Sequence, residues 1–329
     1  MRRRDFITLV GGAAAGWPLA ARAQRSDQMR RIGVLMSFAA DDAAAQARLT
    51  VFLQTLQQLG WMDGRNVRID IRWSASEPER IRRYAAELVA FMPDVILAST
   101  TPGVAALQQA TRTLPIVFVQ VADPVGAGLV ASLAKPGSNA TGFTIYEYGM
   151  AAKWLELLKD IAPRVTRAGI LRDPASVADI GMLGAIQSVA PSLGMQLSPI
   201  NLYDASEIER GISAFAHEPN CRLIVVGAAA AFVHREQIIA LAARYELPAV
   251  YPDQIFITGG GLISYGPDRL EAYRRAASYV DRILKGEKPS DLPVQAPTKY
   301  DLTINLKTAK ALGLVVPPAV LGRADQVIE

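Results

Sequence analysis

Short polar turns follow several apolar runs of this sequence, and their residue types are suited to binding chemistry. The segment STTPG (99–103) comes directly after the run DVILA and combines three hydroxyl groups with the N–H groups of an expected helix start. Hydroxyls and unpaired N–H groups together suit a carboxylate, without help from lysine or arginine. The same residues also suit helix capping, with Pro102 in the first turn, so both roles stay open.

A glycine pattern in DPVGAGLVASL (123–133) fits the dinucleotide-binding motif G-x-G-x-x-A. In a dinucleotide site this motif follows the first strand of a domain, and an acidic residue stands about 20 positions later. Here the motif follows a fourth apolar run, and the first run leads into SFAADDAAA, which has no glycine. We therefore interpret the segment as a tight helix start facing a cleft, with Asp123 as its cap and Pro124 in its first turn.

Residues for nucleophilic, metal or redox catalysis do not occur at a useful spacing. His217 and His234 each lie in or beside an expected helix, with no cysteine or paired acid at metal-ligand spacing. The sequence has no G-x-S-x-G turn and no P-loop, and its single cysteine, Cys221, precedes an apolar run that suits burial. We expect no catalytic residue, no metal and no cofactor.

Short apolar runs alternate with longer helical stretches, a pattern that predicts parallel sheets covered by helices on both faces. The first expected strands are RIGVLMS, VRIDIRW, DVILAST and PIVFVQV, with helices near 43–59, 77–91 and 104–111. The second set is RAGILRD, QLSPINLY, RLIVVGA and PAVYPD, with helices near 177–193, 205–217 and 232–245. Leu59-Gly60 recurs as Leu193-Gly194, 134 positions later, in the matching place. The recurrence predicts two similar lobes.

A tail beyond the second set is more than a single doubly wound domain needs. It contains GGGLISYG, an amphipathic stretch near 268–284, the passage KGEKPSDLPVQAPT and a closing KYDLTINLKTAKALGL. The tail is explained if the chain crosses between lobes near 144–146, near 265–267 and in the proline-rich passage. Several crossings make a hinge, and a hinge between two lobes makes a cleft.

The predicted fold class is therefore α/β, with two doubly wound parallel-sheet lobes joined by a three-segment hinge. We expect residues 30–145 and 266–297 to form lobe 1, and residues 146–265 and 298–329 to form lobe 2. Ligands of open α/β sheets bind outside the carboxyl ends of the strands, so the residues that leave each strand there are the candidate site. The candidates are Ser37, Phe38, Ser99, Thr100, Thr101, Ala122, Asp123, Tyr146, Asp173, Ala228, Tyr251 and Asp253.

Several of these candidates also have a structural interpretation. Asp123 and Asp173 each precede a proline, which favours helix capping, and Asp253 suits the N-cap of a short helix at QIF. The aromatic candidates suit either the wall of an apolar ligand site or the core of a lobe.

The first residues have the features of a secretory signal peptide. Three arginines precede an apolar segment, 6–21, and the small-residue pattern Ala-Arg-Ala stands before Gln24, which predicts cleavage after Ala23. Arg3-Arg4 also fits a twin-arginine export signal. The apolar segment is too short, and too interrupted by glycine and proline, to span a bilayer.

Removal of the leader makes the chain nearly neutral. Residues 1–23 hold four arginines and one aspartate, so the net charge falls from +4 to +1. Such a chain lacks the basic surface of a nucleic-acid-binding protein, and no later segment is apolar enough for a membrane span. We expect a soluble exported protein that binds neither nucleic acid nor membrane.

Several longer motifs carry a resemblance to a known family. The runs DPVGAGLVASLAKPGSNATGFT and GGGLISYGPD, the stretch 279–329 and the leader resemble the substrate-binding proteins of ABC importers, in particular the family with tryptophan-binding components. The resemblance covers essentially the whole chain. It implies a type I periplasmic binding fold that closes on a small ligand and presents it to a membrane permease. In amino-acid binders of this fold a second-lobe acid receives the ligand ammonium, and Asp253 occupies the matching place.

One loop departs from the family pattern, because GAAAAF (227–232) stands where relatives often place a polar or Asp-Pro turn. The change removes a side-chain donor or acceptor, so an aromatic or apolar acid stays open beside an amino acid. We expect a small organic carboxylate as ligand. A periplasmic sensor feeding a membrane receptor and a secreted α/β enzyme are the alternatives. A regulator of this fold would carry a DNA-binding module where the leader stands.

Overall fold

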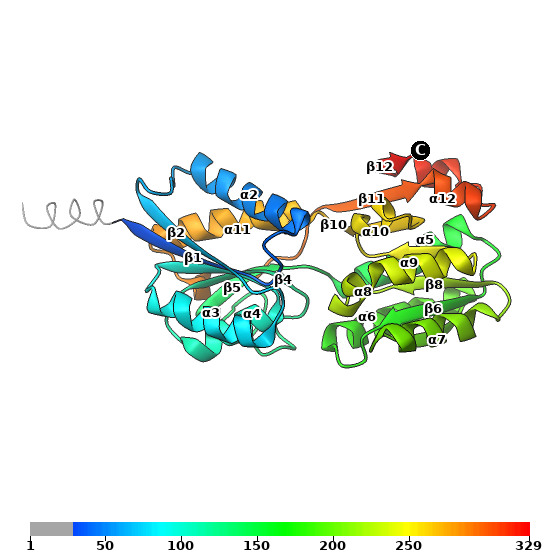
Figure 1. Cartoon of the computed structure of the whole chain (residues 1–329), viewed down its shortest axis with the longest axis horizontal. Helices are drawn as coiled ribbons and strands as arrows, with labels where there is room; N and C mark the ends of the chain where they lie inside the picture. Colours follow the sequence, from blue (N-terminus) through cyan, green and yellow to red (C-terminus); the bar gives the residue numbers. More distant parts are fainter. Residues whose placement is uncertain (1–28) are drawn as a thin grey trace, which may run out of the picture.

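Two α/β lobes lie end to end along the longest axis of the molecule, as Figure 1 shows. The structure is a computed structural model that describes residues 29–329, and the predicted signal peptide lies outside these residues. No helix within residues 29–329 is both long enough and apolar enough to cross a membrane.

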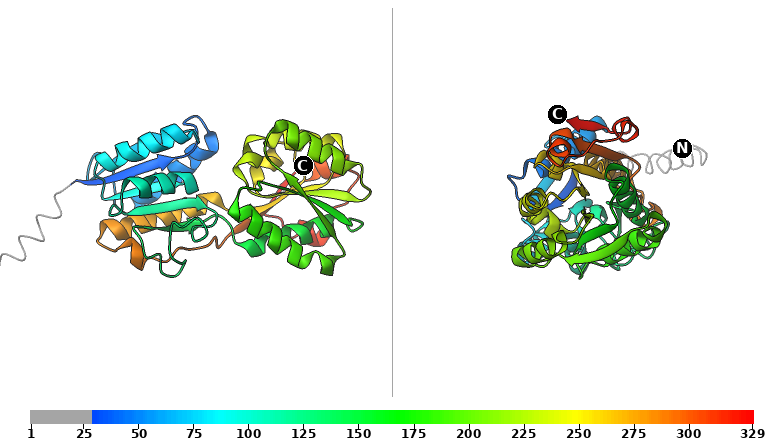
Figure 2. Two further views of the ribbon diagram at one scale, coloured as in Figure 1. Left: turned by 90° about the horizontal axis from the view of Figure 1, so that it is seen from below. Right: turned by 90° about the vertical axis from the view of Figure 1, so that its right-hand side faces the viewer.

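Lobe 1 is built on a five-stranded parallel sheet in the order β2-β1-β3-β4-β5. Helices α2 and α11 pack on one face of this sheet, and α3 and α4 pack on the other (Figure 2). The strands are β1 (Arg30–Met36), β2 (Val67–Trp73), β3 (Val95–Ser99), β4 (Ile116–Val121) and β5 (Ala140–Thr144). The helices are α2 (Ala43–Gln58), α3 (Pro78–Ala90), α4 (Thr101–Ala110) and α11 (Arg269–Leu284).

The central strands of lobe 1 read as unbroken apolar runs because helices cover both of their faces. Every residue of β3 and of β4 is buried. Helix α11 comes from far along the chain and packs against α2, so the first lobe is completed by a late segment.

Lobe 2 holds a seven-stranded sheet in the order β12-β11-β10-β9-β8-β6-β7, in which only β11 and β10 pair antiparallel. Its strands are β6 (Arg167–Arg172), β7 (Gln196–Asn201), β8 (Cys221–Val225), β9 (Ala249–Tyr251), β10 (Ile263–Pro267), β11 (Tyr300–Asn305) and β12 (Gln326–Ile328). Its helices are α5 (Tyr148–Ile161), α6 (Val177–Val189), α7 (Ala205–Ala216), α8 (Ala229–Val233), α9 (Arg235–Arg244), α10 (Gln254–Thr258), α12 (Leu306–Ala311) and α13 (Pro318–Leu321).

The order β7-β6-β8-β9-β10 repeats the order β2-β1-β3-β4-β5 of lobe 1. The predicted α/β fold class with two parallel-sheet lobes is confirmed. In both lobes the first strand lies inside the sheet, so the strand order reverses beside it, and ligands of open α/β sheets bind at the carboxyl ends of the strands at such a point.

Three chain segments connect the lobes, after β5, after β10 and before β11 (Figure 1). Backbone hydrogen bonds hold the first and third side by side, since the Thr144 N–H donates to the Gln295 carbonyl at 2.9 Å. The second and third are joined by the Asp268 N–H, which donates to the Lys299 carbonyl at 3.1 Å. Backbone hydrogen bonds thus tie the three crossings to one another between the lobes.

One expectation about local structure is wrong, and a second holds with changed boundaries. The segment after β4 forms turns rather than a helix: Asp123 Oδ1 accepts from the Gly126 N–H at 2.8 Å, but Gly128 adopts φ +69°, which stops a helix after one turn. The predicted helix at 232–245 is divided at His234, and the alanine loop already enters α8 at its third residue.

Candidate ligand-binding site

Hydroxyl groups from two neighbouring strands meet at the N-terminus of α4. The Thr100 hydroxyl donates to Ser37 Oγ at 2.8 Å, and the Ser37 hydroxyl donates to the Ser99 carbonyl at 2.9 Å. Ser99 is fully buried, whereas Thr100 is half-buried and Thr101 opens the helix. Ser99 therefore forms the buried side of this hydroxyl cluster, and the Thr100 hydroxyl lies at its more exposed edge.

Thr100 is the N-cap residue of α4, but its side chain makes no capping hydrogen bond. Its backbone adopts φ +66°, a conformation that a β-branched residue rarely takes and that is typical of functional sites. The first N–H groups of a helix have no partner within the helix. The α4 N-terminus thus offers its N–H groups to an anion.

Arg48, on the first turns of α2, lies over the ring of Phe38, which follows β1. Its guanidinium carbon is 5.1 Å from the ring centroid. Burial lowers the pKa of Arg48, and the nearby positive charge of Arg269 lowers it further. Within residues 29–329 Arg48 forms no ion pair. The sequence analysis missed it, although it is the only basic residue between Arg31 and Arg65.

Arg269 begins α11 in lobe 1 and reaches into lobe 2. Its guanidinium forms an ion pair with Asp253, donates to the Tyr146 hydroxyl at 3.1 Å and stacks over Phe232 at 4.8 Å. Asp253 Oδ1 also accepts from the Ile255 N–H at 2.9 Å and caps α10. Asp253 is therefore both a cap and the counter-ion of an internal arginine.

Tyr146 lies at the first crossing and is 6% exposed. Burial raises the pKa of its hydroxyl to about 12. The charge of Arg269 lowers this pKa, and the charges of Asp253 and Asp179 raise it. A Cβ atom at Gly227 would lie only 2.0 Å from the Tyr146 hydroxyl oxygen. The glycine that opens the alanine loop is thus needed for the ring to pack there.

Two carboxylates, those of Asp173 and Asp179, lie around the N-terminus of α6, just after β6. Asp179 is 3% exposed, and its carboxylate accepts from the Asp173 N–H at 2.8 Å and from the Ser176 hydroxyl at 3.1 Å. Burial raises the pKa of Asp179 to about 6, although these hydrogen bonds and the charge of Arg172 act to lower it. Asp173 Oδ1 accepts from the Ala175 N–H at 2.9 Å, while Ser176 is the actual N-cap of α6.

Tyr148 connects this acidic group to lobe 1. Its hydroxyl donates to Asp123 Oδ2 at 2.8 Å, and a Cβ at Gly181 of α6 would lie 2.5 Å from its ring. Burial and the Asp123 carboxylate raise the pKa of Tyr148 to about 12. The turn after β4 and the start of α6 therefore face each other across the lobes.

Three of the predicted residues pack in or against the hydrophobic cores. Tyr251 is 1% exposed and stacks on Phe256 at 5.0 Å inside lobe 2, so its ring belongs to the core. Ala228 is buried in the same core, and Ala122 packs half-buried against the cluster that contains Tyr146. Tyr251 therefore packs as the core alternative for the aromatic candidates describes.

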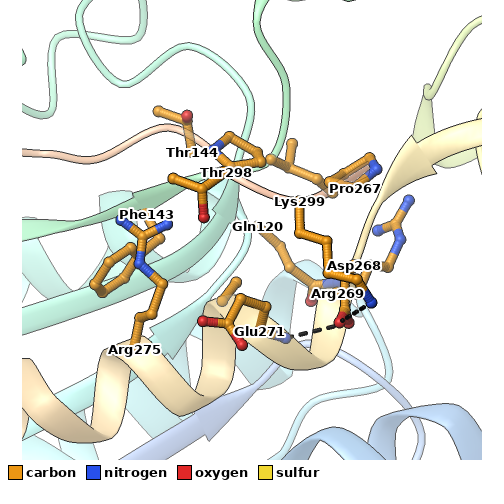
Figure 3. A pocket seen from close by; sticks show the side chains of 13 residues that line it. Gln120, Phe143, Thr144, Pro267, Asp268, Arg269, Glu271, Arg275, Thr298 and Lys299 are labelled. Atoms are coloured by element: carbon orange, nitrogen blue, oxygen red, sulfur yellow. Dashed lines mark hydrogen bonds and ion pairs between the residues drawn. The ribbon is translucent and has the colours of Figure 1, made fainter. Parts of the chain in front are cut away.

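A small pocket lies where the three crossings converge, beside the strand ends, as Figure 3 shows. Gln120 of β4 enters it from an irregularity in the pairing with β5, at φ +57° and 8% exposed. Its Oε1 accepts from the Tyr273 hydroxyl at 3.1 Å, and its Nε2 has no partner in the described chain. The signal for Gln120 is a single amide at the end of the apolar run PIVFVQV. The hinge pocket is lined by Gln120, Phe143, Thr144, Ile145, Pro267, Asp268, Arg269, Glu271, Ala272, Arg275, Pro297, Thr298 and Lys299.

The two lobes thus present groups of opposite charge. Lobe 1 has the α4 N-terminus and the guanidinium of Arg48, and lobe 2 has the half-buried Asp173, which lies beside the buried Asp179 and next to Arg172 in the chain. Half-buried aromatic rings, Phe38 and Phe232, flank these groups. Such a pair of faces suits a small molecule that carries a carboxylate and a cation around an apolar body.

Comparison with known proteins gives consistent matches over the whole described chain. Residues 32–328 match the family described as ABC transporter substrate binding protein. The tyrosine-binding protein of Clostridioides difficile (strain R20291) is 26% identical over 264 residues, which are 80% of this chain and 75% of that protein.

Two solved structures share the fold at similar identity. An ABC domain in complex with L-Trp from Streptococcus pneumoniae is 25% identical, covers 92% of this chain and all of its own, and superposes with a TM-score of 0.83. A ligand-free, open substrate binding protein with adhesive properties from Clostridium difficile is 26% identical over 91% of this chain and 99% of its own, with a TM-score of 0.74.

Proposed function

We propose that this chain, which belongs to the family of ABC transporter substrate-binding proteins, captures an aromatic amino acid between its lobes and delivers it to a membrane permease. The family consists of substrate-binding proteins rather than enzymes. The chain acts after export to the periplasm as a monomer, its leader removed behind Ala23.

The observation that carries this proposal is the opposition of charge between the lobes. An α-amino acid is a zwitterion, and its carboxylate and ammonium need partners of opposite sign a short distance apart. Arg48 and the α4 N-terminus provide the first partner, and the acidic group of Asp173 and Asp179 provides the second. Closure of the lobes brings both onto one ligand.

We assign contact with the apolar part of the ligand to the aromatic residues of the site. Phe38 lies on lobe 1 and Phe232 on lobe 2, each beneath an arginine, so a flat ring fits between two stacked arginine–aromatic pairs. The alanine loop 227–230 adds space without adding a polar group. The tyrosine-binding relative and the L-Trp complex support an aromatic side chain.

The ligand-binding residues proposed from the sequence divide into two groups. Ser37, Phe38, Thr100, Thr101, Asp123, Tyr146 and Asp173 lie at the facing strand ends and are proposed to contact or orient the ligand. Ser99, Ala122, Ala228 and Asp253 are proposed to support them. For Asp253 the reason is its ion pair, because the position proposed for a ligand ammonium already holds Arg269.

A thermal-shift screen of the mature chain, residues 24–329, tests the proposal. A ligand that binds only the folded protein raises its unfolding free energy by about 2.7 kcal/mol at a concentration of 100 Kd. We expect midpoint increases with L-tryptophan, L-tyrosine or L-phenylalanine and none with glucose or myo-inositol. An increase confined to sugars, or to aromatic acids without an amine, would contradict the zwitterion assignment.

A further inference from the structure

Among the charged side chains of the site, Arg48 is the one whose charge is least neutralised by groups of opposite sign. The carboxylates near it already have other partners, since Asp42 Oδ1 accepts from the Ala45 N–H at 2.8 Å as the α2 N-cap. Asp253 is engaged by Arg269 and by the α10 N-terminus. The guanidinium is therefore left beside a second cation, with no carboxylate of residues 29–329 bound to it.

The groups that face Arg48 come from several elements. Arg269 and Tyr273 lie on α11, Asp42 lies at the start of its own helix, and Asp253 lies across the lobes at α10. Burial and Arg269 lower the pKa of Arg48, and the opposing effects of Tyr273, Asp253 and Asp42 offset this only in part. A partly buried charge of this kind is costly unless an anion pairs with it.

The geometry of Arg48 suits recognition rather than packing alone. Its guanidinium carbon lies 5.1 Å from the centroid of the Phe38 ring, and within residues 29–329 its N–H groups form no ion pair. Phe38 follows Ser37 in the chain, and Ser37 bonds to Thr100 at the α4 N-terminus. A carboxylate bound by both Arg48 and the α4 N-terminus would receive a two-pronged arginine contact together with hydroxyl and backbone donors.

We infer that Arg48 is the specificity-determining residue that makes a carboxylate a requirement for the ligand, an inference that rests on the proposed function. Neutral ligands such as sugars leave the guanidinium uncompensated and are rejected on that ground. The carboxylate of the amino acid thus enters on the lobe 1 side, before closure brings lobe 2 onto the ammonium.

Titration calorimetry with L-tryptophan and tryptamine, which lacks the carboxylate, tests the inference on three variants. In Arg48→Gln the affinity for L-tryptophan falls by about 10- to 100-fold, the effect of losing charge-assisted hydrogen bonds. Arg48→Lys keeps the charge without the fork and gives an intermediate loss. Arg112→Gln is the matched control, because Arg112 is exposed and unpaired within residues 29–329, and it binds as wild type.

Two further readouts separate recognition from a structural role. Removal of an uncompensated charge leaves the ligand-free melting midpoint of Arg48→Gln unchanged or higher, while affinity for L-tryptophan falls. Tryptamine binds Arg48→Gln more tightly than it binds wild type, because the variant has no uncompensated guanidinium to repel its ammonium. Equal loss for both ligands, or a lower ligand-free midpoint in both Arg48→Gln and Arg48→Lys, would overturn the inference.

The outcome for the wild type keeps this inference distinct from the proposed function. If wild type binds L-tryptophan and Arg48→Gln binds it equally well, the function stands and the role of Arg48 is refuted. If wild type binds no aromatic amino acid but binds a neutral ligand, both are refuted.

Discussion

The ion pair between Arg269 and Asp253 gives a stability prediction that can be worked from the structure. The two side chains are only 12% and 10% exposed, and they join the start of α11 in lobe 1 to α10 in lobe 2. Asp253→Asn leaves the guanidinium buried with the Tyr146 hydroxyl alone. Breaking a buried pair by removing one partner costs about 3–5 kcal/mol. Asparagine caps helices as well as aspartate does, so the change isolates the charge.

Calorimetric melting of the ligand-free mature chain measures this cost. At about 2–4 °C per kcal/mol for a protein of this size, a loss of 3 kcal/mol lowers the midpoint by about 6–12 °C. Glu79→Gln is the control, because its ion pair with Arg82 is exposed and contributes at most about 1 kcal/mol. Adding Arg269→Met to Asp253→Asn removes the unpaired charge and restores most of the lost stability.

The result that would refute this reasoning is an Asp253→Asn protein that melts like wild type but binds its amino acid poorly. Asp253 would then be unengaged by Arg269 in solution and would serve the ligand ammonium directly.

Three other residues give further predictions. Gly227→Ala places a methyl group against the Tyr146 hydroxyl, so calorimetry should show a loss of about 1–3 kcal/mol, and an unchanged midpoint would contradict the packing. Tyr148→Phe removes the hydrogen bond to Asp123, worth about 1 kcal/mol, so calorimetry should show a ligand-free midpoint lower by about 2–4 °C, and an unchanged midpoint would contradict the contact. Burial raises the pKa of Asp179 from 3.8 to about 6, so the folded state binds the proton more tightly. Wild-type stability should therefore fall by about 3 kcal/mol as pH rises through this range, and Asp179→Asn should flatten that slope in urea melts.

Much of the fold could be predicted from the sequence because parallel sheets covered on both faces leave unbroken apolar runs. The eight predicted strands correspond to β1–β4 and β6–β9, and the late amphipathic stretch is α11. Strand ends then identified the hydroxyl cluster at α4, since the carboxyl ends of neighbouring strands must meet at one edge of a sheet.

The arginines of the site could not be predicted from strand ends. Arg48 and Arg269 lie on helices, and their roles depend on which groups the packing of α2, α11 and α10 brings beside them. Gln120 depends on an irregular pairing of β4 with β5, which apolar periodicity does not reveal. The expected helix after Asp123 fails for a local reason, because a glycine with positive φ ends the turn.

The central claim is that the cleft recognises both charges of an aromatic amino acid. The measurement that tests it most directly is titration calorimetry of the mature wild-type chain with L-tryptophan, tryptamine and indole-3-propionic acid, which share one ring and differ in their charges. We expect L-tryptophan to bind at least tenfold more tightly than either analogue, because each analogue leaves one face of the site unpaired. Equal affinity for all three would show that the ring alone is recognised and would contradict the account.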